Sequence, residues 1–278
     1  MIAITGSTGQ LGTAFRRLLP EAAHLTRRHL DLGDPGSVGE ALAGHRPELV
    51  INCAAYTAVD RAEDEEEAAT VVNGEAVGAM AEWCASHHSK LVTFSTDYVF
   101  DGSGNRPYLE SDPTDPINAY GRSKRLGEEL VLAAHPDALV VRTSWVISGT
   151  HPNFVATMLR LAPERVLTVV DDQRGCPTVA ADLAAATLRA LEVGASGLLH
   201  LTNQGPTTWL GLARAALELA GIDPERVQPC ATADYPTKAR RPAYSVLGSE
   251  RLEVLGIEPL PPWKATLPHL VGGVIRSN

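Results

Sequence analysis

Short apolar runs alternate with longer amphipathic segments along the first half of the chain. The apolar runs lie at residues 1–5, 23–26, 48–52, 90–95 and 138–141, and each has the length of a buried strand. Between them, apolar residues recur at helical spacing, most clearly in 68–85 and 120–134. This alternation predicts an α/β fold with a Rossmann-like, doubly wound parallel sheet.

The alternation becomes irregular after Trp145. A helix is expected at 153–161, a short strand at 166–170, an amphipathic helix at 180–191 and a further helix that ends near Ala220. We therefore expect one domain over residues 1–148, to which a helix–strand segment at about 178–202 returns. Residues 149–278 should mainly form a smaller α/β domain that caps the carboxyl edge of the sheet.

Composition excludes several classes of protein. At 278 residues, with 44% hydrophobic and 21% charged residues, the chain is long enough for a full core and has an ordinary globular composition. A net charge of −9 argues against partners such as nucleic acid or an anionic membrane. No apolar run reaches membrane-spanning length and no basic region precedes the first strand, so we expect no signal peptide and a cytoplasmic location. The four scattered cysteines form no C-x-x-C pair, which is typical of reduced thiols.

A glycine-rich turn follows the first strand. Gly6, Gly9 and Gly12 stand between that strand and a helix, which is the context of a dinucleotide site. Glycines permit the tight turn, the approach of a pyrophosphate to the helix N-terminus and close helix–strand packing. We predict that Gln10 and Leu11 contribute to the same cofactor site. The spacing is G-x-x-G-x-x-G, and the alternative is a plain strand-to-helix turn.

The second strand indicates which nicotinamide cofactor is used. An NAD-specific site usually ends this strand with an acid for the ribose 2′-hydroxyl. Here Arg27 and Arg28 occupy that place and suit a 2′-phosphate, so the sequence favours NADPH over NADH. The alternative is that both arginines are solvated loop residues. The predicted adenine contacts are Asp31 and Leu32.

Small residues after the third strand let the chain pass close to a ligand. The predicted cofactor contacts there are Ala54, Ala55 and Tyr56. Asn73, within the helix that follows, either reaches back to the cofactor or fixes a backbone kink. Cys53 is adjacent, but nothing in the sequence marks it as a nucleophile.

Tyr120 and Lys124 lie one helical turn apart and share a helix face. An ammonium beside a phenol favours the phenolate, which predicts a tyrosine pKa lowered from about 10 toward neutrality. Thr96, which leaves the end of the fourth strand, adds a hydroxyl that can bind the same substrate oxygen. These three groups suit reduction of a carbonyl, with the tyrosine as proton donor. Alone, Tyr-x-x-x-Lys is more often a pair on a helix surface.

The motifs together resemble an extended short-chain dehydrogenase/reductase. The resemblance extends over nearly the whole chain and narrows to the dTDP-4-dehydrorhamnose reductase family. It is carried by the glycine turn and by residues 52–60, 95–100, 120–124, 142–145, 172–178 and 239–242. The string 95–100 is especially specific.

The resemblance implies a reaction and a set of residues. Members of this family reduce the 4-keto group of dTDP-4-dehydro-L-rhamnose with NAD(P)H and form dTDP-L-rhamnose. The first domain would then bind NAD(P), and the smaller one the sugar nucleotide. The catalytic residues would be Thr96, Tyr120 and Lys124. Substrate contacts would be Thr57, Val59, Asp97, Tyr98, Trp145, Arg240 and Arg241. Trp145 is also compatible with a core position, whereas Trp83 and Trp209 are expected to be packing residues.

The chain departs from the family at two positions. Some members bind Mg²⁺ at a dimer interface through glutamates, and the matching residues here are Ala14 and Ala181. Since alanine cannot ligate a metal, we expect no such metal site. The case for this form of dimer is weakened accordingly, and both a monomer and a homodimer remain open.

Three alternatives are compatible with parts of the sequence. One is a reductase of a related dTDP-4-keto-6-deoxyhexose, of the dihydrostreptose type. Another is a non-catalytic NADP-binding regulatory subunit, similar to that of methionine adenosyltransferase, which would have no need of the Thr96, Tyr120 and Lys124 set. The last is an epimerase or dehydratase. Sugar dehydratases usually carry Asp-Glu after the threonine, whereas Asp97 is followed here by Tyr98.

Overall fold

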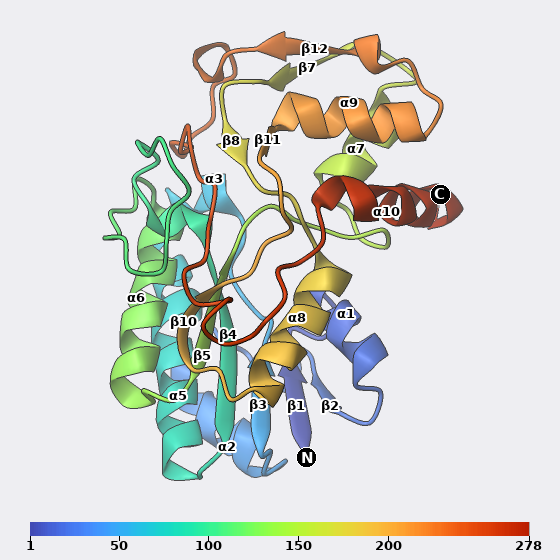
Figure 1. Cartoon of the computed structure of the whole chain (residues 1–278). Helices are drawn as coiled ribbons and strands as arrows, with labels where there is room; N and C mark the ends of the chain where they lie inside the picture. Colours follow the sequence, from blue (N-terminus) through green and yellow to red (C-terminus); the bar gives the residue numbers. More distant parts are fainter. Residues whose placement is uncertain (278) are drawn as a thin grey trace.

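A six-stranded parallel sheet forms the centre of the molecule (Figure 1) in the computed structural model, which describes residues 1–277. The strand order is β10-β5-β4-β3-β1-β2, and every neighbouring pair is parallel. The strands are β1 (Ile2–Thr5), β2 (Ala23–Leu25), β3 (Leu49–Asn52), β4 (Lys90–Thr96), β5 (Leu139–Thr143) and β10 (Gly197–His200).

Helices cover both faces of the sheet. Apolar side chains such as Phe15 and Ile51 fill the core beneath α1 (Gln10–Leu18) and α8 (Ala180–Glu192). A second core, with Leu42 and Met80, underlies the helices of the opposite face (Figure 1). Those helices are α2 (Val38–Ala43), α5 (Ala76–Ser86) and α6 (Ala119–Ala134). The predicted α/β class with a doubly wound sheet is confirmed.

The segment predicted as one helix over 68–85 is interrupted. It consists of α4 (Glu66–Thr70), a π-helical stretch η2 (Val71–Glu75) and then α5. A π-helical turn inside a helix often marks a functional position. Other short elements near the carboxyl edge are η1 (Pro35–Ser37), α3 (Val59–Ala62) and the 3₁₀ turn η3 (Asp97–Val99).

The elements beyond the sheet's carboxyl ends have a core of their own (Figure 1). Val155, Leu212 and Val271 are among its buried side chains. The elements in this part of the chain are β6 (Val146–Ile147), α7 (Phe154–Leu161), β7 (Leu167–Val170), β8 (Arg174–Gly175), β9 (Thr178–Val179), β11 (Thr207–Thr208), α9 (Trp209–Leu219), η4 (Pro224–Arg226), β12 (Val227–Cys230), η5 (Thr232–Asp234) and α10 (Trp263–Ser277). They pair as β6–β9, β7–β12 and β8–β11.

Two features of this region matter for the chain's organisation. Strand β10 pairs with β5 and so extends the central sheet, although it follows a long excursion through the other elements. Helix α10 was not predicted, because Pro268 and the pair Gly272-Gly273 interrupt its sequence with residues that disfavour helix. The division at residue 148 stays a prediction.

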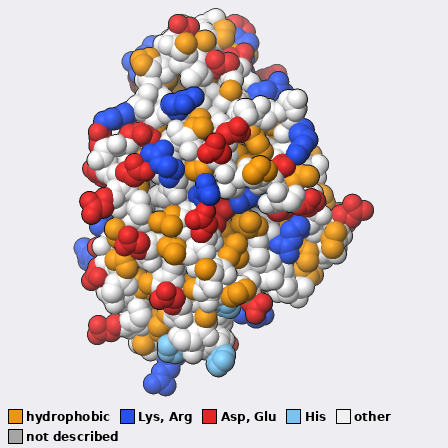
Figure 2. Space-filling view, turned by 90° about the vertical axis from the view of Figure 1, so that its left-hand side faces the viewer, with side chains coloured by type: hydrophobic (Ala, Val, Ile, Leu, Met, Phe, Trp, Pro, Cys, Tyr) orange, Lys and Arg blue, Asp and Glu red, His pale blue; other side chains and the backbone are white. Residues whose placement is uncertain are grey.

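The charged surface is mixed on the face shown in Figure 2, where acidic and basic side chains are interspersed. Arg122 of α6 pairs with Glu66 at 2.7 Å, and Arg125 pairs with Glu129 at 2.8 Å, both at exposed positions. Exposed pairs of this kind contribute little to stability. Among residues 1–277, no helix is both long and apolar enough to cross a membrane.

Candidate active site

Several of the predicted site residues lie at the edge of the sheet where the strand order reverses. The chain runs from β1 to β2 on one side and through β3, β4, β5 and β10 on the other, so the switch point lies between β1 and β3. In open parallel sheets, ligands bind at the carboxyl ends of the strands next to such a point. Gly6, Cys53 and Thr96 stand at the carboxyl ends of β1, β3 and β4.

The glycine turn requires glycine at two of its three positions. Gly6 has φ of +57°, and a Cβ there would lie 2.6 Å from the Ala54 backbone nitrogen. A Cβ on Gly12 would lie 2.2 Å from the Gly6 carbonyl oxygen. Gly9 is the N-cap of α1, and no side chain caps this end of the helix. Its first N–H groups therefore fit the pyrophosphate of a dinucleotide.

The side chains that follow the turn have other partners. Gln10 Nε2 donates to the Val146 carbonyl at 3.2 Å, and Gln10 Oε1 accepts from Ser148 at 2.9 Å. Leu11 packs against the apolar core. Any cofactor contact from these two residues would therefore come from their backbone N–H groups.

Of the predicted cofactor contacts after β2, some lie at the surface and one lies in the core. Arg28 is exposed and belongs to none of the ion pairs of the described chain, whereas Arg27 pairs with Asp31 at 3.3 Å. The Gly33 N–H and Arg27 lower the pKa of Asp31. Leu32 is 5% exposed and packs in the core, so little of its side chain is accessible, and its adenine contact stays a prediction.

Asn73 fixes the backbone rather than reaching toward the glycine turn. Its Oδ1 accepts from the Tyr56 N–H at 2.9 Å, and its Nδ2 donates to the Tyr56 carbonyl and to Ser123 Oγ, both at 3.0 Å. The Tyr56 phenol donates to Glu65 at 2.7 Å and accepts from Arg61. Of the two predicted roles of Asn73, the hydrogen bonds favour the one that fixes the backbone. The cofactor contact of Tyr56 stays a prediction.

Ala54 and Ala55 remain beside the glycine turn, since Ala54 lies against Gly6. Cys53 is adjacent, and burial raises the pKa of its thiol. A protonated thiol is a poor nucleophile, in line with the interpretation of this residue from the sequence.

Thr96 and Tyr120 lie together at the end of β4. The Thr96 hydroxyl donates to Asp97 Oδ1 at 3.0 Å and accepts from the Tyr98 N–H at 3.2 Å. The rings of Tyr98 and Tyr120 meet edge to face with centroids 6.1 Å apart. A hydrogen bond with Thr96 also acts on the Tyr120 phenol. Lys124, one turn further along α6, is 5% exposed.

The pKa values of this group differ from the prediction. Burial raises the pKa of Tyr120 to about 12, with a further rise from the Asp97 carboxylate, while Thr96 acts in the opposite direction. The expected shift toward neutrality under the influence of Lys124 is therefore wrong, because desolvation of the phenolate dominates. Burial lowers the pKa of Lys124 to about 8, and the carboxylate of Glu128 opposes this change. Asp97 has its pKa raised by burial to about 7.

Two residues that sequence reasoning did not select hold the N-terminus of α6. Asn118 Oδ1 accepts from the Gly121 N–H at 2.7 Å as the N-cap, and its Nδ2 donates to the Arg240 carbonyl at 2.9 Å. Glu63 accepts from the Ala119 N–H at 2.8 Å. The position of Asn118 directly before the helix was a recognisable capping signal.

The two arginines of the 235–242 loop, Arg240 and Arg241, differ in their contacts. Arg241 forms a bidentate pair with Asp60, with N–O distances of 2.8 and 3.1 Å. Partial burial works against ionisation of Asp60, yet Arg241 and the Ala239 N–H hold its pKa below its usual value. The Arg240 side chain is exposed. Near them, Thr57 is exposed and Val59 begins α3.

Trp145 is held in an unusual conformation. Its φ is +45°, and its ring stacks on Trp209 with centroids 3.6 Å apart and an interplanar angle of 10°. Gly175 lies against the ring, since a Cβ there would come within 2.5 Å of Trp145 Cε2. Both indole rings are half-buried beside the second core, so Trp145 is partly a packing residue and partly accessible.

Ala14 and Ala181 line one cavity, at the positions where the resemblance places metal-binding glutamates. Ala14 is buried and Ala181 is exposed. Within residues 1–277, no group of three or more His, Cys, Asp or Glu side chains is arranged to hold a metal ion.

Comparison with known proteins adds to this geometry. The family described as "RmlD substrate binding domain" matches residues 1–274. The chain belongs to the dTDP-4-dehydrorhamnose reductase family. It is 46% identical over 276 residues to the dTDP-4-dehydrorhamnose reductase of Streptomyces griseus, across 95% of this chain and 90% of that protein. It is also 46% identical to a probable dTDP-4,6-dihydroxy-2-methyloxan-3-one 4-ketoreductase of Streptomyces antibioticus, across 99% of this chain and 96% of that protein.

Solved structures agree with this family. The dTDP-4-dehydrorhamnose reductase of Clostridium acetobutylicum superposes with a TM-score of 0.94 at 36% identity and covers 98% of both chains. The Bacillus anthracis dTDP-4-dehydrorhamnose reductase, solved in complex with NADP, gives a TM-score of 0.92 at 35% identity and covers 97% of both. The predicted family, the oxidoreductase class and the NADP-type cofactor are thereby confirmed.

Proposed function

We propose that the chain reduces the 4-keto group of dTDP-4-dehydro-L-rhamnose with NADPH and forms dTDP-L-rhamnose. The observation that carries this proposal is the placing of Thr96, the partly buried Tyr120 and the buried Lys124 at the carboxyl end of β4, on the edge that also bears the glycine turn. The bound nicotinamide would supply a hydride to the sugar carbon. The cytoplasm is the location we propose for this reaction.

In this proposal Tyr120 gives its proton to the sugar oxygen. A phenol with a pKa of about 12 retains its proton at neutral pH, which is the form that a proton donor needs. The Thr96 hydroxyl would bind the same oxygen and stabilise the negative charge that develops there. Lys124 would hold the cofactor ribose and, as a cation, favour proton loss from Tyr120 when the oxygen accepts it.

The substrate would enter between the sheet edge and the 235–242 loop. Arg240, exposed and without an ion pair among the described residues, and the Asp60-held Arg241 would face its diphosphate. We propose Thr57, Val59, Asp97, Tyr98 and Trp145 as the remaining contacts. Whether the enzyme acts as a monomer or a homodimer does not alter these roles.

A second candidate substrate has support of its own. A dTDP-4-keto-6-deoxy-D-glucose reductase of Streptomyces niveus is 42% identical over 270 residues, and the Streptomyces antibioticus relative is a probable 4-ketoreductase of another dTDP sugar. Reduction of a related dTDP-4-keto-6-deoxyhexose is therefore the alternative. A non-catalytic regulatory subunit is disfavoured, because Thr96, Tyr120 and Lys124 are all present.

The test is oxidation of NADPH by the purified chain, followed by NMR of the product. We expect faster turnover with dTDP-4-dehydro-L-rhamnose than with dTDP-4-keto-6-deoxy-D-glucose, and dTDP-L-rhamnose as product. Faster turnover of the second sugar would favour the alternative. No oxidation with either sugar would contradict both.

Cofactor preference should depend on Arg28. Replacing Arg28 by alanine removes a charge-assisted contact to the 2′-phosphate, so kcat/KM for NADPH should fall by about tenfold or more while the value for NADH changes little. Steady-state kinetics with both cofactors measures this. Arg165→Ala, at an exposed position far along the sequence, is the control. A wild-type enzyme that clearly prefers NADH would refute the NADPH assignment.

The rate should also fall at high pH. Lys124 is charged below its folded-state pKa of about 8 and neutral above it, so kcat/KM should decrease through this range as the pH rises. The decrease should approach tenfold per pH unit once the pH is well above 8. A pH profile of kcat/KM in the reduction direction tests this. A flat profile between pH 7 and about pH 10 would remove Lys124 charge from the mechanism.

A further inference from the structure

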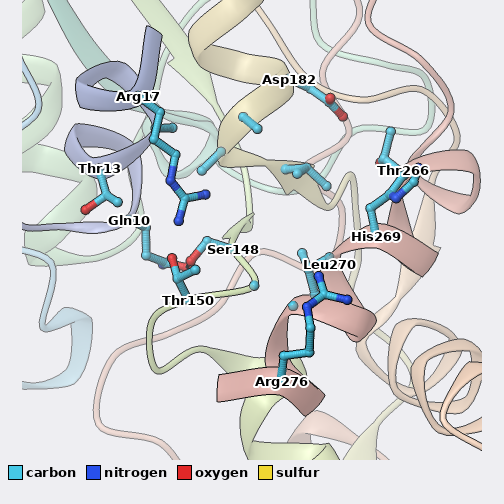
Figure 3. A pocket seen from close by; sticks show the side chains of 16 residues that line it. Gln10, Thr13, Arg17, Ser148, Thr150, Asp182, Thr266, His269, Leu270 and Arg276 are labelled. Atoms are coloured by element: carbon cyan, nitrogen blue, oxygen red, sulfur yellow. Dashed lines mark hydrogen bonds between the residues drawn. The ribbon is translucent and has the colours of Figure 1, made fainter. Parts of the chain in front are cut away.

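A cavity of about 540 Å³ lies between α1, α8 and α10, and none of the residues proposed as catalytic lines it (Figure 3). This volume falls in the range of small-molecule sites. Its walls come from α1, from the loop after β6, from the start of α8 and from α10. Its lining residues include Thr13, Arg17, Thr150, Ala181, Asp182 and Arg276.

Two guanidinium groups extend into this cavity. Arg17 of α1 and Arg276 of α10 approach it from opposite sides (Figure 3). Both side chains are exposed, and neither belongs to an ion pair within the described part of the chain. Asp182 is the one carboxylate among the lining residues, and its Oδ2 accepts from Asn203 Nδ2 at 2.8 Å. The two arginines are therefore available to an anion.

The other walls suit a small organic molecule that carries phosphate. Thr13 and Thr150 lie on the α1 side of the cavity (Figure 3), and their hydroxyl groups contact His151 Nε2 at 3.4 Å and Nδ1 at 3.0 Å. Ala180, Ala181 and Gly149 present small side chains or none, which leaves room for a ring against this wall. The volume exceeds what a single inorganic ion needs, because a water molecule occupies about 30 Å³ in the liquid.

We propose that this cavity binds a phosphorylated small molecule of nucleotide size, with Arg17 and Arg276 as its phosphate contacts. Guanidinium groups bind phosphate oxygens through paired N–H donors, and two of them on opposite walls suit a diphosphate better than a monoanion. The one predicted cofactor contact that lines the cavity is Gln10, whose side chain is held by Val146 and Ser148, so the proposed ligand is neither the reducing cofactor nor the keto sugar. The proposal goes beyond the proposed function and does not depend on it.

The probe is inorganic pyrophosphate, titrated by calorimetry into the full chain. NADP⁺ and dTDP are first added at saturating concentration, so that the proposed cofactor and substrate sites are already filled. We expect one further saturable site in the wild-type protein. The R17A/R276A variant should bind pyrophosphate at least about tenfold more weakly, since two charge-assisted contacts are lost.

The matched control is R16A/R189A, which removes the same charge from exposed positions of α1 and α8 that do not line the cavity. It should bind as the wild type does. Equal weakening in both double variants would indicate general attraction of anions and overturn the proposal. Absence of a saturable site in the wild type would do the same.

A second copy of the chain is the competing occupant of this cavity. Sedimentation of wild type and R17A/R276A distinguishes the two. An unchanged oligomeric state in the variant, together with its weakened binding of pyrophosphate, supports the proposal. A change of oligomeric state without pyrophosphate binding by the wild type overturns it. Because the readouts are binding and mass, a protein without reductase activity would still give a decisive result.

Discussion

Tyr120→Phe should lower kcat by about 10²- to 10⁴-fold, the usual contribution of a positioned general acid. The change removes one hydroxyl and keeps the ring that meets Tyr98 edge to face, so the fold around it should persist. Because phenylalanine has no proton to give, the loss should fall on turnover. The measurement is single-turnover oxidation of NADPH with the keto-sugar nucleotide at saturation.

Binding of NADPH separates this effect from misfolding. Fluorescence titration should give the same Kd for NADPH in Tyr120→Phe and wild type. Thr168→Val, at an exposed position of β7, removes a hydroxyl at the surface and should leave kcat unchanged. An unaltered kcat in Tyr120→Phe would exclude this residue as the proton donor.

Glu128→Ala should lower the free energy of unfolding by about 3–5 kcal/mol, because it leaves a buried guanidinium without its counter-charge. Glu128 and Arg142 are 5% and 3% exposed and form two hydrogen bonds of 2.8 and 2.6 Å. His200 does not replace the lost carboxylate. Its Nδ1 faces the Gly248 carbonyl at 2.7 Å and so carries the hydrogen, and burial lowers the pKa of the ring.

Glu129→Ala on the same helix is the control for this change. Glu129 pairs with Arg125 at the surface, where both side chains are about half exposed, so its loss should cost less than about 1 kcal/mol. Urea denaturation followed by circular dichroism compares the two variants. Equal unfolding midpoints would show that burial of the Glu128–Arg142 pair contributes nothing to stability.

The sequence was sufficient for the central sheet and for the residues at its carboxyl edge. Strand-length apolar runs located β1, β3 and β4 closely, because a strand buried on both faces must be apolar throughout. The glycine turn and the Tyr120–Lys124 pair each involve residues that are close in the sequence, so their local geometry could be predicted from their spacing. Both were expected at the same edge of the sheet because the strands were predicted to be parallel.

Other features depend on packing between distant segments, and no local pattern reports them. The side chain of Asn73 was open to two interpretations, and the structure favours the one in which it clamps the backbone of Tyr56. The rise in the pKa of Tyr120 results from burial, which two residues on one helix face cannot reveal. Asp60 and Arg241 are 181 residues apart in the sequence. No local pattern could therefore predict that they form an ion pair.

The position of β10 has a consequence for truncated forms of the protein. Residues 197–200 seal one side of β5, and His200 reaches the Glu128–Arg142 pair through Arg142 at 3.4 Å. A fragment that stopped at residue 148 would leave unpaired those N–H and C=O groups of β5 that face β10, while the pairing with β4 would remain. Such an open border recruits strands from other molecules. Expression of residues 1–148 alone should therefore yield aggregates, and a soluble version would have to carry β10 with it.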